Sequence, residues 1–159
     1  RAHEAVVPLE RARDLCFTLN FFVMGPCVTG WLANAVTEIG QPARAREIAA
    51  QSIDTDLYRH GGRYAWVFVH IALAEALFGC GETKAALDKV ETALDIANTS
   101  NEPIQIAQAL FTRGRLRAKA QSAGAGLADM RAALALAERH GLDPLARACR
   151  RVIDEAAPN

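Results

Sequence analysis

The sequence predicts an all-α protein, a right-handed α-solenoid of stacked antiparallel helix pairs, and three observations support this. Alanine accounts for 32 of the 159 residues, whereas aromatic residues make up only 6%. Alanine has the highest helix propensity and lets helices pack closely. Small residues recur at intervals of 40 or 41 residues, which is typical of repeat architectures. Glycine and proline gather in short turns between helical runs, and this leaves no room for a sheet.

Eight helical runs can be recognised along the chain. Pro26 falls inside the second, where its missing amide hydrogen should kink the helix or delay its start. Asp143 followed by Pro144 indicates the start of the last run, with Asp143 as its N-cap. That run is apolar on one face and charged on the other, as expected of a helix that covers the end of an array. The runs are 1–16, 22–39, 43–56, 62–79, 84–97, 103–121, 124–137 and 144–157.

Small residues occupy fixed places in these helices. The second helix of each pair carries two of them seven residues apart, which is about two helical turns, so both lie on one face. The first helix of each pair carries one more, and small residues on such a face let a neighbouring helix approach closely. The repeat positions are Ala5, Ala12, Ala33, Ala45, Ser52, Ala74, Ala86, Ala93, Gly114, Gly126 and Ala133.

This periodicity predicts one repeat domain over residues 1–159. It divides into the second helix of an incomplete repeat, three full repeats and a capping helix. The chain starts at Arg1 without a methionine, and its first residues already form an amphipathic pattern. We therefore expect a segment of a longer protein. The divisions are 1–19, 20–59, 60–100, 101–141 and 142–159.

The best copy of the repeat resembles the tetratricopeptide repeat (TPR) family. The run 81–87, Gly-Glu-Thr-Lys-Ala-Ala-Leu, followed by Ala93 and Leu94, is similar to the family's turn and second helix. Leu32-Ala33 and Leu73-Ala74 match the pair in the family's first helix. The resemblance covers nearly the whole chain and implies the right-handed superhelix.

Several positions depart from the family pattern. The period of about 40 is longer than the family's usual 34 residues. Arg113 and Arg117 replace expected apolar residues in the third pair, and the family's first-helix tryptophan place holds Thr29, His70 and Leu110. The long period and the alanine content resemble the repeat region of large bacterial signalling proteins. These include LuxR-type and maltose-activator-type regulators and ATPase-linked cyclases and kinases, whose repeats receive a signal.

Stacked pairs should form a concave groove lined by the first helix of each pair. Its predicted residues mix aromatic, amide, acidic and basic groups, which suits a peptide, a protein segment or a small effector. For the aromatic members and Ile71, packing between helices is an equally good interpretation. The predicted groove residues are Asn34, Thr37, Tyr64, Phe68, Ile71, Glu75, Phe78, Gln108, Phe111 and Arg115.

Basic residues alternate along the run 103–121. Arg113 and Arg117 share one face, and Arg115 and Lys119 share another. A contact with an anion or an acidic peptide is one interpretation, and a solvated basic helix is the more ordinary one. Residues 51–100 carry a net charge of −3 and residues 101–159 a net charge of +3, which could favour end-to-end association.

Several function classes are disfavoured by composition and spacing. A net charge of zero argues against a dedicated nucleic-acid binder, and no apolar stretch has the length of a membrane span. Four cysteines without CxxC spacing suggest reduced, mostly buried thiols. The four histidines are scattered, so we expect no metal and no cofactor, and no catalytic constellation is present.

The sequence therefore predicts a non-catalytic interaction module of a cytoplasmic signalling or transcription regulator. Its partners would be a protein, peptide or small effector and the other domains of its parent chain. The alternative is a structural scaffold that self-associates or docks onto the parent's ATPase module.

Overall fold

The computed structural model describes residues 2–53, 62 and 65–156. Every regular element in these ranges is helical, which confirms the all-α prediction. The longer turn between α7 and α8 includes a short 3-10 segment, η2 (Ala123–Gly126). The α-helices are α1 (Ala2–Thr18), α2 (Met24–Glu38), α3 (Pro42–Ile53), α5 (Trp66–Gly79), α6 (Thr83–Ser100), α7 (Pro103–Ala120), α8 (Leu127–Arg139) and α9 (Asp143–Glu155).

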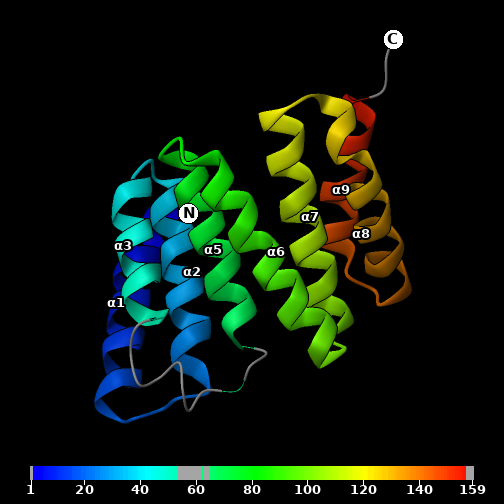
Figure 1. The fold of residues 1–159 in the computed structure, drawn as a ribbon. Helices are drawn as coiled ribbons and strands as arrows, with labels where there is room; N and C mark the ends of the chain where they lie inside the picture. The colour runs from blue at the N-terminus through cyan, green and yellow to red at the C-terminus, as the bar shows by residue number, and fades with distance from the viewer. Residues whose placement is uncertain (1, 54–61, 63–64, 157–159) are drawn as a thin grey trace.

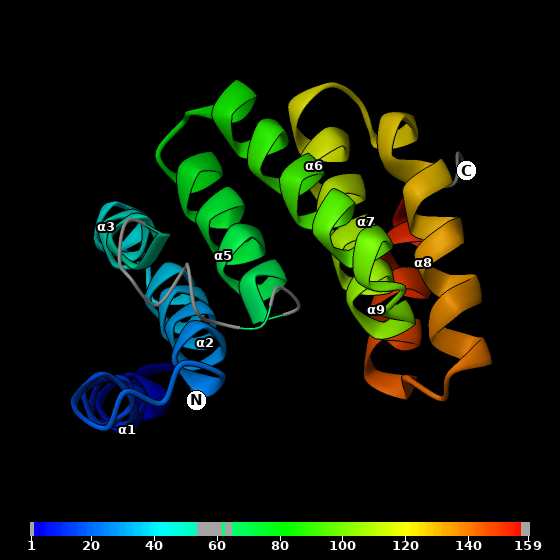
Figure 2. The same cartoon turned by 60° about the horizontal axis from the view of Figure 1, so that its bottom comes forward.

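The helices run across the molecule from α1–α3 through α5, α6 and α7 to α8 and α9 (Figure 1). Each packs against the next along the chain, and α5 also packs against α2, α3 and α7. Figure 2 shows α1–α3 on one side of α5 and α6–α9 on the other. Since α2, α5 and α7 contact one another in sequence, residues from three first helices of predicted pairs come to one surface.

Helix ends agree with the predicted turns with small corrections. α2 begins at Met24, so Pro26 lies in its first turn, where its missing N–H removes no helical hydrogen bond. α9 begins at Asp143, one residue earlier than predicted, and Leu142 occupies the cap position. The prediction of Asp143 as N-cap is therefore wrong, and its carboxylate instead lies in the first turn, where it complements the helix dipole.

Three helices end at a glycine, which can adopt a positive φ because it has no side chain. Gly40, Gly81 and Gly141 all have positive φ, between 67° and 84°. After each, the next amide donates to a carbonyl five residues back, as in Glu82 N to Leu77 O at 2.9 Å. This is the Schellman geometry, and it reverses the chain within two or three residues.

Most of the small repeat positions are buried. Nine of the eleven are buried, whereas Ala5 and Ala12 on α1 are half-buried. Larger apolar side chains are also buried, with Leu32, Leu116 and Met130 at most 1% exposed. Buried apolar residues form one large cluster from α1, α2, α3, α5 and α6 with Leu116 of α7, and a smaller cluster between α5, α6 and α7.

Two contacts bring helix backbones together directly. A Cβ on Gly126 would lie 2.0 Å from the carbonyl oxygen of Gly114, so α7 and the start of α8 touch through their main chains. A Cβ on Gly30 would lie 2.8 Å from the carbonyl of Phe68, which joins α2 to α5 in the same way. Gly114 and Gly126 were predicted as repeat positions, whereas Gly30 was not.

The described helices of the chain vary in length and apolar content. None of them combines the length and the apolarity that a bilayer span requires.

Candidate functional site

A groove of about 530 Å³ lies along the surface that α2, α5 and α7 share. Nine of the ten predicted groove residues line it, and the tenth, Tyr64, lies outside the described residues. Its volume falls in the range of about 300–1,000 Å³ that is usual for ligand sites. The lining comprises Trp31, Asn34, Thr37, Glu38, Phe68, Ile71, Glu75, Phe78, Gly79, Gln108, Phe111, Thr112, Arg115, Lys119 and Leu145.

One end of the groove is aromatic. Trp31 and Phe68 meet edge to face, with ring centroids 6.2 Å apart and an interplanar angle of 64°. The backbone approach at Gly30 holds α2 and α5 close enough for this contact. Trp31 is 43% exposed, and Phe68 and Phe111 are half-buried, so aromatic surface remains accessible. Ile71 is only 8% exposed and belongs largely to the interhelix core, as the alternative interpretation held.

The other end of the groove carries charge. Arg115 Nη1 lies 3.4 Å from Glu75 Oε1, and its guanidinium also lies 5.6 Å from the centre of the Phe111 ring. Lys119 Nζ lies 5.9 Å from the centre of the Phe78 ring. These are cation–π distances, so the aromatic rings position both cations along the α7 wall.

Polar groups between these two ends have limited hydrogen bonding. The Thr37 hydroxyl donates to the Ala33 carbonyl at 2.9 Å, which leaves its oxygen able to accept a bond from a ligand. Gln108 Oε1 is buried and accepts no hydrogen bond within the described part of the chain. Each of these two oxygens therefore retains acceptor capacity within the groove lining.

The opposite face of α7 holds an ion-pair network. Arg113 donates to Asp129 at 2.7 and 3.0 Å and to Glu91 at 2.6 Å. Arg117 donates to the same two carboxylates at 3.1 and 2.9 Å. Hydrogen bonding to Asp129 is the main cause that raises the pKa of Arg113. These arginines join α6, α7 and α8, and both earlier interpretations are wrong for them: they are neither simply solvated nor available to an anion.

His70 is one of the buried residues of α5. It is 3% exposed on α5, and burial, assisted by the charge of Lys89, lowers its pKa to about 4. A buried imidazole with so low a pKa is neutral near pH 7. The residue therefore acts as part of the core.

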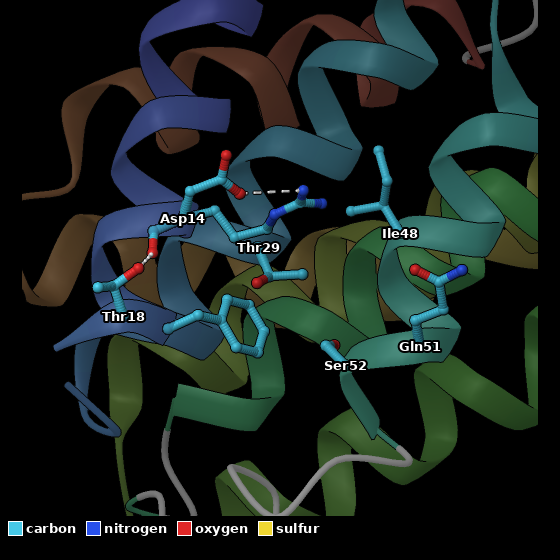
Figure 3. Close-up of a pocket in the computed structure, with 8 residues that line it drawn as sticks. Asp14, Thr18, Thr29, Ile48, Gln51 and Ser52 are labelled. Carbon is cyan, nitrogen blue, oxygen red and sulfur yellow. Dashed lines mark hydrogen bonds and ion pairs between the residues drawn. The ribbon is translucent and has the colours of Figure 1, made fainter. Parts of the chain in front are cut away.

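A second hollow, of about 470 Å³, lies between α1, α2 and α3. Figure 3 shows Asp14 and Thr18 of α1 on one side, Gln51 and Ser52 of α3 on the other, and Thr29 of α2 between them. Thr29 is 1% exposed, and its hydroxyl donates to the Gly25 carbonyl at 2.8 Å. This hollow was not predicted from the sequence, because Ser52 was interpreted only as a small repeat position.

All four cysteines lie in the described part, none forms a disulfide, and only Cys80 is more than slightly exposed. Burial raises the pKa of the Cys149 thiol to about 11. Within residues 2–53, 62 and 65–156, no three His, Cys, Asp or Glu side chains are placed to hold a metal ion.

The groove also contains residues that were not predicted, and helical spacing from the predicted ones identifies most of them. Trp31 lies three residues before Asn34, and Lys119 lies four after Arg115, so each shares a helix face with a predicted residue. Leu145 reaches the groove from α9, which was treated only as a cap. Helical spacing therefore identifies the first two but not the third.

Comparison with models of known protein families gives no match for this chain, and comparison with curated proteins gives no significant match.

Proposed function

We propose that this chain is a non-catalytic interaction module whose groove binds a peptide segment of a partner protein. In a longer chain it would serve as the sensing region of a signalling or transcription regulator. The observation that supports this is the convergence of aromatic and charged side chains from α2, α5 and α7 on one groove. Aromatic surface provides affinity, and polar groups at one end fix the orientation of the ligand.

We infer that the helices form a TPR-like right-handed solenoid with α9 as its cap. The buried repeat positions and the contacts of α5 with both α2 and α7 support stacked pairs. Exposed charges on the outer face of α9 support its role as a cap, since a terminal helix needs a polar exterior. They are Arg147, Arg150, Arg151, Asp154 and Glu155.

Two tryptophans allow a direct test with a random peptide library displayed on phage. Trp31 lies in the groove, whereas Trp66 is 3% exposed. In a Trp66→Phe background, peptides that enter the groove should change the fluorescence of Trp31. Phe111→Ala should weaken their binding at least about tenfold, because a central aromatic contact is lost.

The matched control is Ile104→Ala, since Ile104 is 46% exposed on the same helix and does not line the groove. Binding to this variant should equal wild type. Selected peptides that bind equally well to the Phe111→Ala and Ile104→Ala variants, and leave Trp31 fluorescence unchanged, would show that the groove is not the binding site.

Self-association is a second candidate function, favoured by an apolar surface at the turn between α1 and α2. Five large apolar residues there are between 38% and 71% exposed: Leu15, Phe17, Leu19, Phe21 and Val23. Contiguous exposed apolar residues commonly mark association sites. Light scattering over a wide concentration range should detect dimers that Leu19→Lys abolishes, and a monomer at every concentration would refute this candidate.

A further inference from the structure

The three arginines of α7 divide between two faces, and only one has spare hydrogen-bonding capacity in the groove. Together, Arg113 and Arg117 donate five hydrogen bonds to Asp129 and Glu91 on the far face. Arg115 makes a single 3.4 Å ion-pair contact, with Glu75. A guanidinium has five N–H donors, so most of those of Arg115 remain available to a ligand.

Lys119 adds a second cation to the same wall. It lies one helical turn beyond Arg115, is exposed, and contacts the Phe78 ring. Ammonium groups also donate three hydrogen bonds and pair with carboxylates. Two cations one turn apart therefore face the charged end of the groove, while the aromatic end lies toward the N-terminal half of α5.

Two acidic residues line the groove. Glu75 is 18% exposed and contacts Arg115 through one oxygen, so little of its carboxylate is accessible to an incoming base. An incoming carboxylate can instead approach the unoccupied donors of Arg115 while the existing ion pair persists. Glu38 lies across the groove on α2.

We propose that the groove selects an acidic peptide segment. A Glu or Asp side chain of the ligand binds Arg115 and Lys119, and an aromatic or aliphatic side chain beside it packs between Trp31, Phe68 and Phe111. This inference rests on the proposed function, because it specifies the chemistry of the peptide that the same groove takes. Binding should weaken as the salt concentration rises, since both charge contacts are partly solvated.

The test uses the library peptides that bind in a groove-dependent way. Acidic residues should be enriched in them relative to the unselected library. Synthetic copies labelled with fluorescein, each with its acidic residues replaced by Gln or by Lys, are then compared by anisotropy. We expect the Gln peptide to bind about tenfold more weakly than the parent and the Lys peptide more weakly still, because charge-assisted hydrogen bonds are lost.

Substitutions in the protein show which side chains bind the acidic residue of the peptide. Arg115→Gln and Lys119→Gln should each weaken binding of the acidic peptide about tenfold but leave binding of its Gln copy unchanged. Arg131→Gln, an exposed cation on α8, is the matched control and should bind like wild type. Melting temperatures verify that each variant folds. If Arg115→Gln does not fold, Lys119→Gln tests the proposal alone.

The outcomes distinguish this inference from the function on which it rests. Groove-dependent peptides that are neutral or basic, or whose affinity is insensitive to Arg115→Gln and Lys119→Gln, would overturn the acidic preference and leave the proposed function standing. A library that yields no groove-dependent peptide would overturn both.

Discussion

Asp129 offers the sharpest test of how the helices are held together. Its side chain is 8% exposed and accepts three hydrogen bonds, two from Arg113 and one from Arg117. Asp129→Asn keeps the size of the side chain but removes its charge and points an amide N–H₂ group at the two guanidinium groups. The substitution leaves two cations facing Glu91 alone.

The size of the effect follows from exposure. Breaking a fully buried ion pair costs about 3–5 kcal/mol. Here the side chains of Arg117 and Glu91 are 35% and 42% exposed, so water and Glu91 compensate part of the loss. We expect Asp129→Asn to lower the free energy of unfolding by about 2–3 kcal/mol and the melting temperature by roughly 5–10 °C. Glu91→Gln, on the exposed side of the network, should cost only about 0.5–1 kcal/mol.

Urea unfolding followed by circular dichroism measures these differences. A double-mutant cycle with Arg113→Met isolates the contact, because removing both Arg113 and the charge of Asp129 leaves Arg117 and Glu91 as a balanced pair. The double variant should be more stable than the sum of the single effects by at least about 1.5 kcal/mol. Equal, small losses for Asp129→Asn and Glu91→Gln, with no coupling, would refute the view that this network joins the helices.

Three further predictions concern the core. The pKa of His70 is lowered to about 4 in the folded chain, so the unfolded chain takes up a proton at this residue first as pH falls. The free energy of unfolding should therefore drop by up to about 3 kcal/mol between pH 6.5 and 4. In urea titrations at a series of pH values, His70→Gln should reduce this dependence on pH. Gly126→Ala should lower the free energy of unfolding by about 2–3 kcal/mol, since the new Cβ would lie 2.0 Å from a backbone carbonyl oxygen of α7. The control is Gly124→Ala, whose Cβ would meet nothing within 4 Å and whose stability in thermal melts should remain within about 0.5 kcal/mol of wild type. Under native conditions a thiol reagent should modify Cys80 first and Cys149 only on unfolding, since burial raises the pKa of the latter; equal labelling rates in a mass-spectrometric time course would contradict the packing of α9.

The sequence predicts much of the fold because its information is local and periodic. Helix boundaries follow from glycine and proline, and the interhelix contacts follow from small residues such as Ala74 and Ala93 at fixed intervals. The groove could be predicted for the same reason, since residues like Phe68 and Glu75 share one face of a helix. Each of these inferences needs only local turn residues, the spacing within a helix or the repeat interval along the chain.

The pairing partners of Arg113 could not be predicted in this way. Asp129 and Glu91 lie 16 and 22 residues away on two other helices, and their approach depends on how each helix is rotated about its axis. The contact at Gly30 has the same origin, because a single glycine does not reveal which backbone will approach it. Rotation and spacing between helices are set by the whole array of side chains, which no single run of sequence contains.

The two faces of α7 differ in how freely their residues can be substituted during evolution. Residues 113 and 117 are constrained by carboxylates on neighbouring helices, so a change at either requires a compensating change elsewhere. Residues 115 and 119 face outward into the groove and make few contacts within the chain. Alternate positions on one helix thus separate the contacts that assemble the helices from the proposed recognition surface, so a change of ligand would not require rebuilding the scaffold.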